Sequence, residues 1–266
     1  SDFDLVIADE AHRCAGKVSD AFGSVLDENK IKSSKRLFFT ATPRVLSKQL
    51  KKSASEKEIE VASMDDHSVF GEVLYQIKFS EAIKRDLLSD YQVVVVGVDD
   101  QMIRDQIKNR DLLEISSNGL KTDAENLSAH IALTKAIKKY ELGKLITFHG
   151  LVKGAKNFAE DHLKIHEWID NSSKLMREIS TAHVSGRMNS AERNKKINNL
   201  KNIKKGEIGI LTNARCLSEG VDVPTLDGIA FIDPKQSQVD IIQAVGRAIR
   251  KSEDKTFGTI VIPVYI

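Results

Sequence analysis

Short apolar runs alternate along the chain with longer segments in which apolar residues recur at helical spacing. The short runs predict strands over residues 5–8, 37–39, 91–98, 145–148, 182–184, 208–212, 229–232 and 259–264. The longer segments predict helices over residues 81–88, 101–115, 124–141, 152–168, 188–203 and 237–250, with a charged helix or loop at 48–60. Strands that alternate with helices are typical of α/β folds with a parallel sheet.

Two local features refine this picture. The four valines at 93–96 suit a parallel strand that is covered on both faces. Ser80 precedes the helix expected at 81–88 and is placed to cap it. The chain shows no internal repeat and no low-complexity tract, and residues 75–90 are the expected domain junction.

Composition narrows the class of protein only slightly. Of the 266 residues, 41% are hydrophobic and 29% are charged, as in an ordinary globular protein. The net charge of +2 neither favours nor excludes a nucleic-acid partner, because a local basic stripe would suffice. Cys14 and Cys216 lack CxxC spacing, which disfavours a disulfide or zinc site. With no signal peptide and no apolar run near the roughly 20 residues of a membrane span, we expect a cytoplasmic protein without a membrane partner.

The first candidate site is Asp9-Glu10-Ala11-His12, directly after the strand at 5–8. Ligands of open α/β sheets bind at the carboxyl ends of strands. One carboxylate there can hold a Mg²⁺ shell, and its neighbour can orient or deprotonate an attacking water. The alternative is an acidic loop that follows a core strand.

The second candidate is Thr40-Ala41-Thr42-Pro43-Arg44, also at the end of an apolar run. Two hydroxyls that flank an alanine can hydrogen-bond to loops on either side of a cleft. The alternative is a helix start, with Thr40 or Thr42 as the cap and Pro43 at the first helical position.

The third candidate joins a strand that ends in Thr212 and Asn213 to a turn that carries Gly220 and Asp222. Backbone N–H groups and the Thr212 hydroxyl could contact a phosphate, and Asp222 could accept a hydrogen bond from a ribose hydroxyl. The alternative is a polar loop with Gly220 at a positive φ.

The fourth candidate is the helix at 237–250. At about 100° per residue, Gln243, Arg247 and Arg250 fall within roughly 60° of one another. Such a stripe suits bidentate recognition of phosphate oxygens, and its arginines could stabilise charge in phosphoryl transfer. The opposite face would pack on the sheet through Ile241, Ile242, Val245 and Ile249. The alternative is an exposed polar stripe on a surface helix.

Weaker signals lie elsewhere. The strand at 145–148 ends in polar groups that include Thr147 and His149, and the strand at 182–184 is followed by Ser185. A basic run lies at 193–205, where a solvated helix face and a contact with a nucleic-acid backbone are both open.

Taken in order, these segments resemble motifs II to VI of superfamily 2 helicases. The resemblance spans the chain and rests on DEAHRCAG, LFFTATPRVL, SMDDHSVFGEV, LTNARCLSEGVDVP and SQVDIIQAVGRAIRK. In detail these segments resemble the motor subunits of restriction-modification systems of type I, III and ISP. The fold implied is α/β, with RecA-like parallel sheets flanked by helices. It would comprise the C-terminal part of a first motor domain at 1–78 and a complete second motor domain at 79–266.

The resemblance also implies residue roles. Asp9 would hold Mg²⁺, Glu10 would be the catalytic carboxylate, and Arg247 and Arg250 would be arginine fingers that reach the γ-phosphate. The remaining roles would be coupling by His12, Thr40 and Thr42, ATP binding by Gly220, Asp222 and Gln243, and nucleic-acid contact by Thr147, His149, Ser185, Thr212 and Asn213.

One departure from the family matters. Such motors grip ATP with a GxxxxGK[ST] loop, and this sequence has none, since neither Gly16-Lys17 nor Gly143-Lys144 is followed by Ser or Thr. We therefore interpret the chain as a fragment that is inactive alone, with an incomplete first domain that either packs against the second domain in an unusual way or self-associates.

The function expected is that of an ATP-dependent DNA helicase or translocase motor in a restriction or defence system. It would use ATP and Mg²⁺, act on double-stranded DNA, and work with restriction-system subunits or fused domains. The alternative is a nucleic-acid-binding or regulatory module without motor activity, which a missing phosphate loop in the natural gene would favour.

Overall fold

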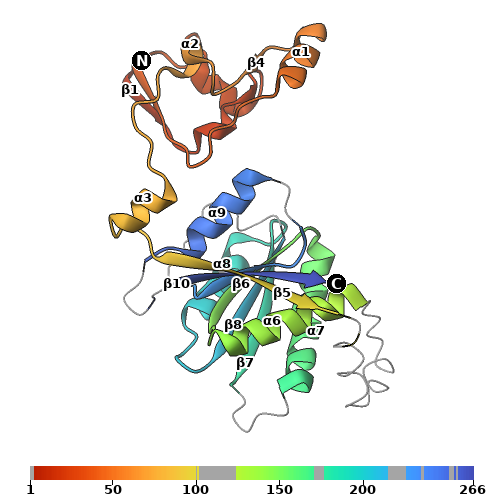
Figure 1. Cartoon of the computed structure of the whole chain (residues 1–266). Helices are drawn as coiled ribbons and strands as arrows, with labels where there is room; N and C mark the ends of the chain where they lie inside the picture. The colour runs from red at the N-terminus through yellow and green to blue at the C-terminus, as the bar shows by residue number, and fades with distance from the viewer. Residues whose placement is uncertain are drawn as a thin grey trace. The chain divides into compact units, whose positions relative to one another are not determined.

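The computed structural model describes residues 3–99, 101, 124–170, 177–214, 226–234, 237–251, 255 and 257–266. The chain divides into two compact units, Ser1–Ile77 and Lys78–Ile266, each of which is described by itself (Figure 1). The predicted helix at 101–115 lies almost entirely outside the described residues.

The first unit is built around two short sheets. Strands β1 (Phe3–Ala8) and β3 (Ser33–Phe38) pair in parallel, and β2 (Gly16–Lys17) pairs antiparallel with β4 (Val61–Ala62). Along the chain, the 3₁₀ helices η1 (Ala11–Arg13) and η2 (Ala21–Leu26) and the helix α1 (Lys48–Glu56) lie between these strands, and α2 (His67–Phe70) follows β4. Alternate residues of β1 (Phe3, Leu5 and Ile7) are exposed by 52%, 46% and 60%. One face of this strand is therefore apolar and open.

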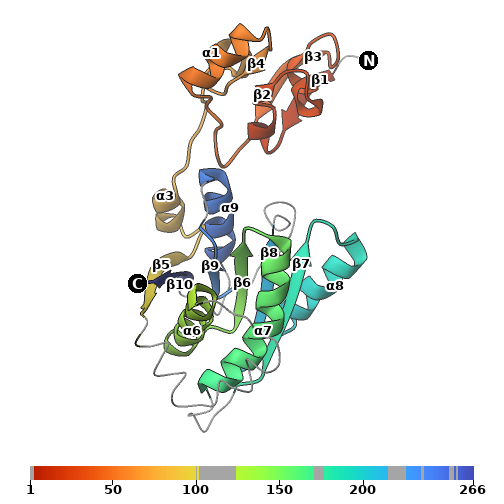
Figure 2. The same cartoon turned by 90° about the vertical axis from the view of Figure 1, so that its right-hand side faces the viewer.

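The second unit contains a sheet of six parallel strands among the described residues, in the order β5-β10-β9-β6-β8-β7 (Figure 2). The strands are β5 (Asp90–Val98), β6 (Lys144–His149), β7 (Ile179–Ser185), β8 (Ile208–Ala214), β9 (Gly228–Phe231) and β10 (Phe257–Tyr265). The helices are α3 (Phe79–Lys84), α6 (Ala124–Lys139), α7 (Val152–Asp170), α8 (Ser190–Lys201) and α9 (Gln238–Ala248). The α/β fold with a parallel sheet is confirmed.

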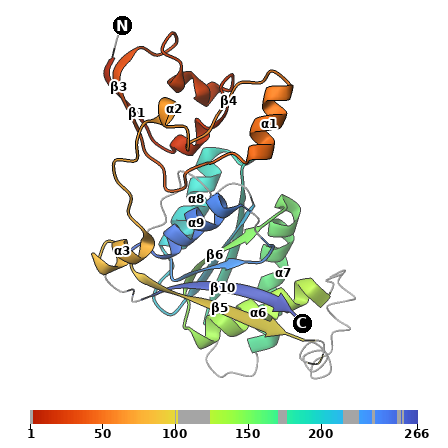
Figure 3. The ribbon, with the colours of Figure 1, turned by 45° about the horizontal axis from the view of Figure 1, so that its top comes forward.

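Helices cover both faces of this sheet. Buried residues of α6 and α7 pack with Leu145, Ile210 and Val261 on one face, whereas α8 and α9 pack with Leu211 and Ile260 on the other. Figure 3 shows β5 and β10 along one edge of the sheet, close to α6. Among the described helices, none has both the length and the apolar character needed to cross a membrane.

Two expectations for this unit were wrong. Among the described residues, strand β5 lies at an edge of the sheet, and Val93 and Val95 are 53% and 63% exposed, so the valine run is not covered on both faces there. Valine also suits an edge strand, because its branched side chain favours extended backbone wherever the strand lies. Ser80 does not cap α3, because this helix begins at Phe79 and its N-cap is Lys78, without a side-chain cap.

A cluster of histidines lies in the core between α6 and α7. His130 and His162 are fully buried, and their Nδ1 atoms lie 2.9 Å apart. Both rings stack on Phe158. Burial, together with the nearby His149, lowers the pKa of His130 to about 3. The pKa of His162 lies well below its usual value, mainly through burial and then through His130 and His166.

Candidate functional site

The carboxyl ends of β1 and β3 hold the two predicted motifs of the first unit together. The Phe39 N–H donates to the Ala8 carbonyl, and the Ala11 N–H donates to the Phe39 carbonyl, both at 2.8 Å. These bonds continue the parallel pairing past the strands. The loop that carries Asp9 and Glu10 is thereby fixed beside the one that carries Thr40.

The acidic pair has a specific local geometry. Asp9 is exposed, and its Oδ1 accepts a hydrogen bond from the Glu10 N–H at 2.8 Å. An exposed carboxylate at a strand end fits the oxygen-rich shell of Mg²⁺. Glu10 has φ 50° and ψ 42°, the left-handed conformation that non-glycine residues rarely adopt. Strain of this kind concentrates at functional sites because the surrounding structure must hold it in place.

His12 links the two motifs. Its side chain is buried, and its Nδ1 lies 3.1 Å from Thr40 Oγ1 and 3.4 Å from Glu10 Oε2. The Thr40 hydroxyl in turn accepts the Thr42 N–H at 3.1 Å. The structure therefore brings Glu10, His12 and Thr40 into one cluster of polar contacts.

The alternative role of the threonines as helix caps is wrong. Residues 43–47 are not helical, and α1 begins at Lys48 with Ser47 as its cap, whose hydroxyl accepts the Leu50 N–H at 3.2 Å. Thr42 is buried, and its Oγ1 has no hydrogen-bond partner among the described residues.

Arg44 and Ser63 complete this region, and the sequence did not assign either of them a role. Arg44 Nη1 donates to the Ala15 carbonyl at 2.9 Å and so ties the segment after η1 to the second motif. Buried Ser63 accepts the Leu46 N–H at 2.9 Å and bonds to Asp65. Both residues lie in segments that carry the family resemblance, which was the only signal that could have found them.

In the second unit, the predicted nucleic-acid residues gather at the carboxyl ends of neighbouring strands. They end β6 (Thr147 and His149), β7 (Ser185) and β8 (Thr212 and Asn213). All five are buried. Thr147 Oγ1 lies 2.9 Å from His149 Nε2, and the Thr212 hydroxyl donates to the Ala155 carbonyl of α7 at 2.7 Å. These side chains hold the strand ends and the following helix in place.

Asp233, which the sequence did not single out, belongs to the same edge. It follows β9, and its Oδ2 accepts the Gly150 N–H at 2.7 Å across the neighbouring strand end. The bond fixes the turn between β6 and α7.

The fourth candidate site of the sequence lies on and directly after α9. Ser237 caps this helix by accepting the Asp240 N–H at 3.3 Å. Arg247 is only 9% exposed, and Gln243 is half-buried, with an Nε2 that has no partner among the described residues. Gly220 and Asp222 lie outside the described residues.

Arg250 departs from the expected helical stripe. Helix α9 ends at Ala248, and Arg250 lies beyond it, exposed and bridged antiparallel to Leu88. The Ser89 N–H donates a hydrogen bond to the Ile249 carbonyl at 2.8 Å, and the Lys255 ammonium donates one to the Ala248 carbonyl. Burial lowers the pKa of Lys255 to about 8.

The face of α9 that packs on the sheet also differs from the expected one. Ala244, Ala248 and Ile249 are buried, whereas Ile241 and Ile242 are only half-buried. Small side chains let the helix approach the sheet closely. The expected burial of Ile241 and Ile242 was therefore too high.

Comparison with known proteins identifies the class. Residues 129–252 match the family described as "Helicase conserved C-terminal domain". The second unit is thus similar to the C-terminal domain of helicase-type motors, and the chain is related to superfamily 2 helicases.

More particular relatives link the chain to restriction enzymes. A structure titled "ATP-dependent Type ISP restriction-modification enzyme LlaBIII bound to DNA" matches all of this chain and 18% of its own, with 31% identity and a TM-score of 0.80. The type I restriction enzyme EcoAI endonuclease subunit of Escherichia coli is 23% identical over 94% of this chain and 30% of its own length. The predicted resemblance to helicases of restriction systems is confirmed.

Viral helicases are similar as well. A protein named as a probable helicase in African swine fever virus (isolate Pig/Kenya/KEN-50/1950) is 27% identical over the whole of this chain. The chain spans about a quarter of that relative, 26% of its length.

Proposed function

We propose that these residues are part of an ATP-dependent DNA helicase or translocase motor of a restriction or defence system. The likeness to a DNA-bound type ISP restriction enzyme over the whole chain supports this function. The observation that carries it is the cluster of Glu10, His12 and Thr40, because it joins a strained carboxylate to a second loop through a buried histidine.

In this proposal the two carboxylates divide the work of ATP hydrolysis. Asp9 holds the shell of a Mg²⁺ ion, which neutralises charge on the phosphates when bound. Glu10 orients the attacking water and takes up its proton. Arg247 and Arg250 stabilise the charge that develops on the γ-phosphate, and Gln243, with Gly220 and Asp222, binds the nucleotide.

Coupling to DNA uses the remaining predicted residues. His12 responds to Glu10 through the ion-pair contact at 3.4 Å, and acts on Thr40 and Thr42 through the hydrogen bonds described above. The buried side chains at the ends of β6, β7 and β8 shape the loops that follow them, whose backbone N–H groups then contact phosphates of double-stranded DNA. The partners proposed are DNA and other subunits or fused domains of the restriction system.

We also propose that the 266 residues alone do not hydrolyse ATP, because they contain no GxxxxGK[ST] loop to grip the β- and γ-phosphates. The open face of Phe3, Leu5 and Ile7 supports self-association of the first unit when nothing covers it.

The test is DNA-stimulated ATP hydrolysis by this chain and by the full-length product of its gene. We expect activity only in the full-length protein, and a loss of at least about 100-fold in Glu10→Gln, because general-base catalysis contributes that much. Glu58→Gln is the matched control, since Glu58 is a second glutamate of the first unit with a left-handed backbone, at φ 53°.

The outcomes of this assay distinguish a motor from a nucleic-acid-binding or regulatory module without motor activity. Activity in the full-length protein that Glu10→Gln abolishes and Glu58→Gln retains supports the motor. Activity in the 266-residue chain would overturn the proposed need for a phosphate loop. No ATP hydrolysis by either protein would refute the motor function and leave a nucleic-acid-binding or regulatory module.

A further inference from the structure

The two edges of the six-stranded sheet are built differently. At the β7 edge, His183 is surrounded by charged side chains from two helices. These form the pairs Lys156–Glu160 on α7 and Glu192–Lys196 on α8, at 3.7 and 3.4 Å. No large apolar side chain of β7 is exposed. Charges along an edge discourage the addition of another strand.

In the part of the chain that the structure describes, no charged pairs flank the β5 edge in this way. This strand is nine residues long, and within the described part of the chain it pairs only with β10. Tyr91, Val93 and Val95 are 40%, 53% and 63% exposed. The sequence carries no charged residue between Asp90 and Asp99. A long, apolar edge of this kind is a template for strand pairing.

A groove beside this edge is lined by lysines, which favour a partner with acidic side chains. It has a volume of about 290 Å³ and runs between residues 94–97 of β5 and one side of α6. Lys135 and Lys139, one helical turn apart, line it together with Tyr140. The Lys139 ammonium lies 5.4 Å from the centre of the Tyr140 ring. The helix thus places two positive charges along the open strand.

The two faces of β5 differ in chemistry. Val93 is in register with Ile260, which packs on the α8 and α9 side of the sheet. Val94 is in register with Val261, which packs on the α6 side, where the lysines lie. Side chains of an added strand would alternate between these faces, because the strand period is two residues.

We propose that the β5 edge binds an extended partner segment as a seventh strand, and that this segment alternates apolar with acidic residues. Its apolar side chains cover Val93 and Val95. Its carboxylates face Lys135 and Lys139 across the groove. Backbone hydrogen bonds supply affinity, and the two faces supply specificity. This inference does not depend on the proposed motor function.

The probe is a nine-residue peptide of alternating valine and glutamate, which matches the length of β5. Binding to the 266-residue chain is measured by fluorescence anisotropy, and hydrogen exchange locates the site. We expect protection of the β5 amides on binding. A peptide methylated on every second backbone nitrogen should not bind, because it cannot form the ladder. A valine–lysine peptide should bind at least about tenfold more weakly, because its charges repel the groove.

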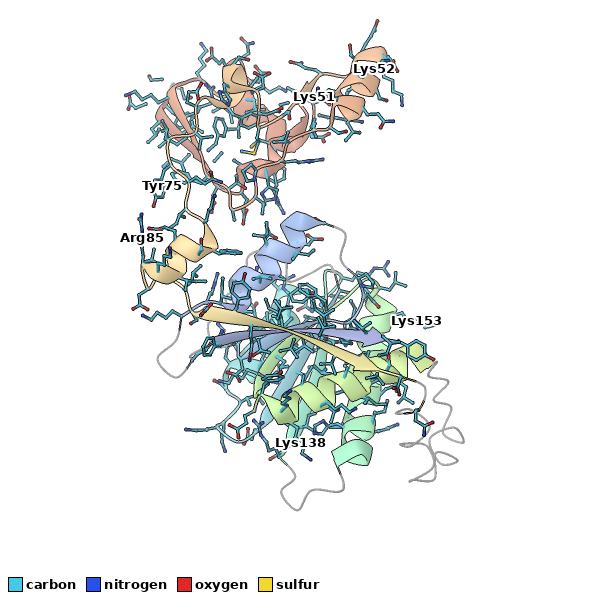
Figure 4. All side chains as sticks on the ribbon, viewed as in Figure 1. Lys51, Lys52, Tyr75, Arg85, Lys138 and Lys153 are labelled. Atoms are coloured by element: carbon cyan, nitrogen blue, oxygen red, sulfur yellow. The ribbon has the colours of Figure 1, made fainter. Side chains whose placement is uncertain are left out.

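Variants of α6 test whether binding depends on the lysines of the groove or only on the overall positive charge of the helix. We expect Lys139→Glu to weaken binding about tenfold, since it replaces an attraction by a repulsion. Lys138→Glu is the matched control, because Lys138 is exposed on the same helix (labelled in Figure 4) and does not line the groove. It should change binding by less than about twofold. Val95→Thr tests the apolar face and should weaken binding without unfolding an edge strand.

Three results would overturn the proposal. The first is no binding up to about 1 mM peptide. The second is equal binding of the methylated peptide or of the Lys138→Glu and Lys139→Glu variants. The third is protection of β5 that grows with protein concentration in the absence of peptide, which would assign the edge to a second copy of the chain.

Discussion

Acid should destabilise the second unit through its buried histidine pair. His130 and His162 are fully buried, and the titratable groups that face them are His149 on β6 and His166 on α7. None of these neighbours supplies a negative charge that would stabilise an imidazolium. Protonation is therefore disfavoured in the folded state and free in the unfolded chain.

The size of the effect follows from the pKa difference. The pKa of His130 is about 3 when folded, against about 6.5 for an exposed imidazole. The stabilisation is complete above about pH 6.5 and is lost as the pH falls toward 3, because the unfolded state then binds more protons. The shift of His130 therefore changes the free energy of unfolding by about 5 kcal/mol in all, and by about 1.4 kcal/mol per pH unit within this range. A domain is stable by only about 5–15 kcal/mol, so the loss from His130 alone reaches the lower end of that range.

Urea unfolding at several values between about pH 5 and pH 8 measures this slope. The fluorescence of Trp168, the single tryptophan, follows the second unit because it lies in α7. In the double variant His130→Phe and His162→Phe, the slope between about pH 5 and pH 6 should fall by more than about 1.4 kcal/mol per pH unit, which is the contribution of His130 alone. Phenylalanine suits both sites, since each ring already stacks on Phe158.

His67→Phe is the control, because this histidine is half exposed in the first unit. It should leave the slope reported by Trp168 unchanged. An equal slope in the wild type and the double variant would refute the reasoning, since it would mean that the core histidines take up protons without unfolding the domain.

Three further predictions concern side chains that form local hydrogen bonds. Asn189→Ala should lower the free energy of unfolding by about 1 kcal/mol, because Asn189 caps α8 through the Glu192 N–H, and urea unfolding would show it. Asp227→Ala should lower it by about 3 kcal/mol in the same assay, because one carboxylate oxygen accepts two backbone N–H groups, at 2.8 and 2.7 Å, at the start of β6. Thr40→Val should leave ATP binding by the full-length protein intact and lower its DNA-stimulated hydrolysis at least about tenfold, since it removes the bond to His12, whereas an unchanged rate would remove Thr40 from the coupling path.

Sequence reasoning found the strands of the sheet because their apolar runs are bounded by polar turns. It missed the two-residue strands β2 and β4, since pairs as short as Gly16–Lys17 leave no periodic pattern. It also placed β5 in the interior, because a valine run does not reveal which strand pairs with which. That information lies in the long-range register with β10.

For the candidate site too, local sequence patterns could be predicted, whereas features set by long-range contacts could not. The proximity of Glu10, His12 and Thr40 could be expected from motifs at neighbouring strand ends. The end of α9 before Arg250 could not, because it depends on the bridge to Leu88, 162 residues earlier in the sequence. Local spacing predicts a helix face but not the tertiary contact that stops the helix.

The pairing of β5 with β10 sets the order in which the second unit can be assembled during synthesis. Gln92 and Thr259 bond side by side although 167 residues separate them. A ribosome therefore releases β5 long before its neighbour exists, and closing so long a loop is slow. Until β10 emerges, the apolar strand that follows the first unit stays unpaired, and a chaperone that binds extended apolar segments would find its target there.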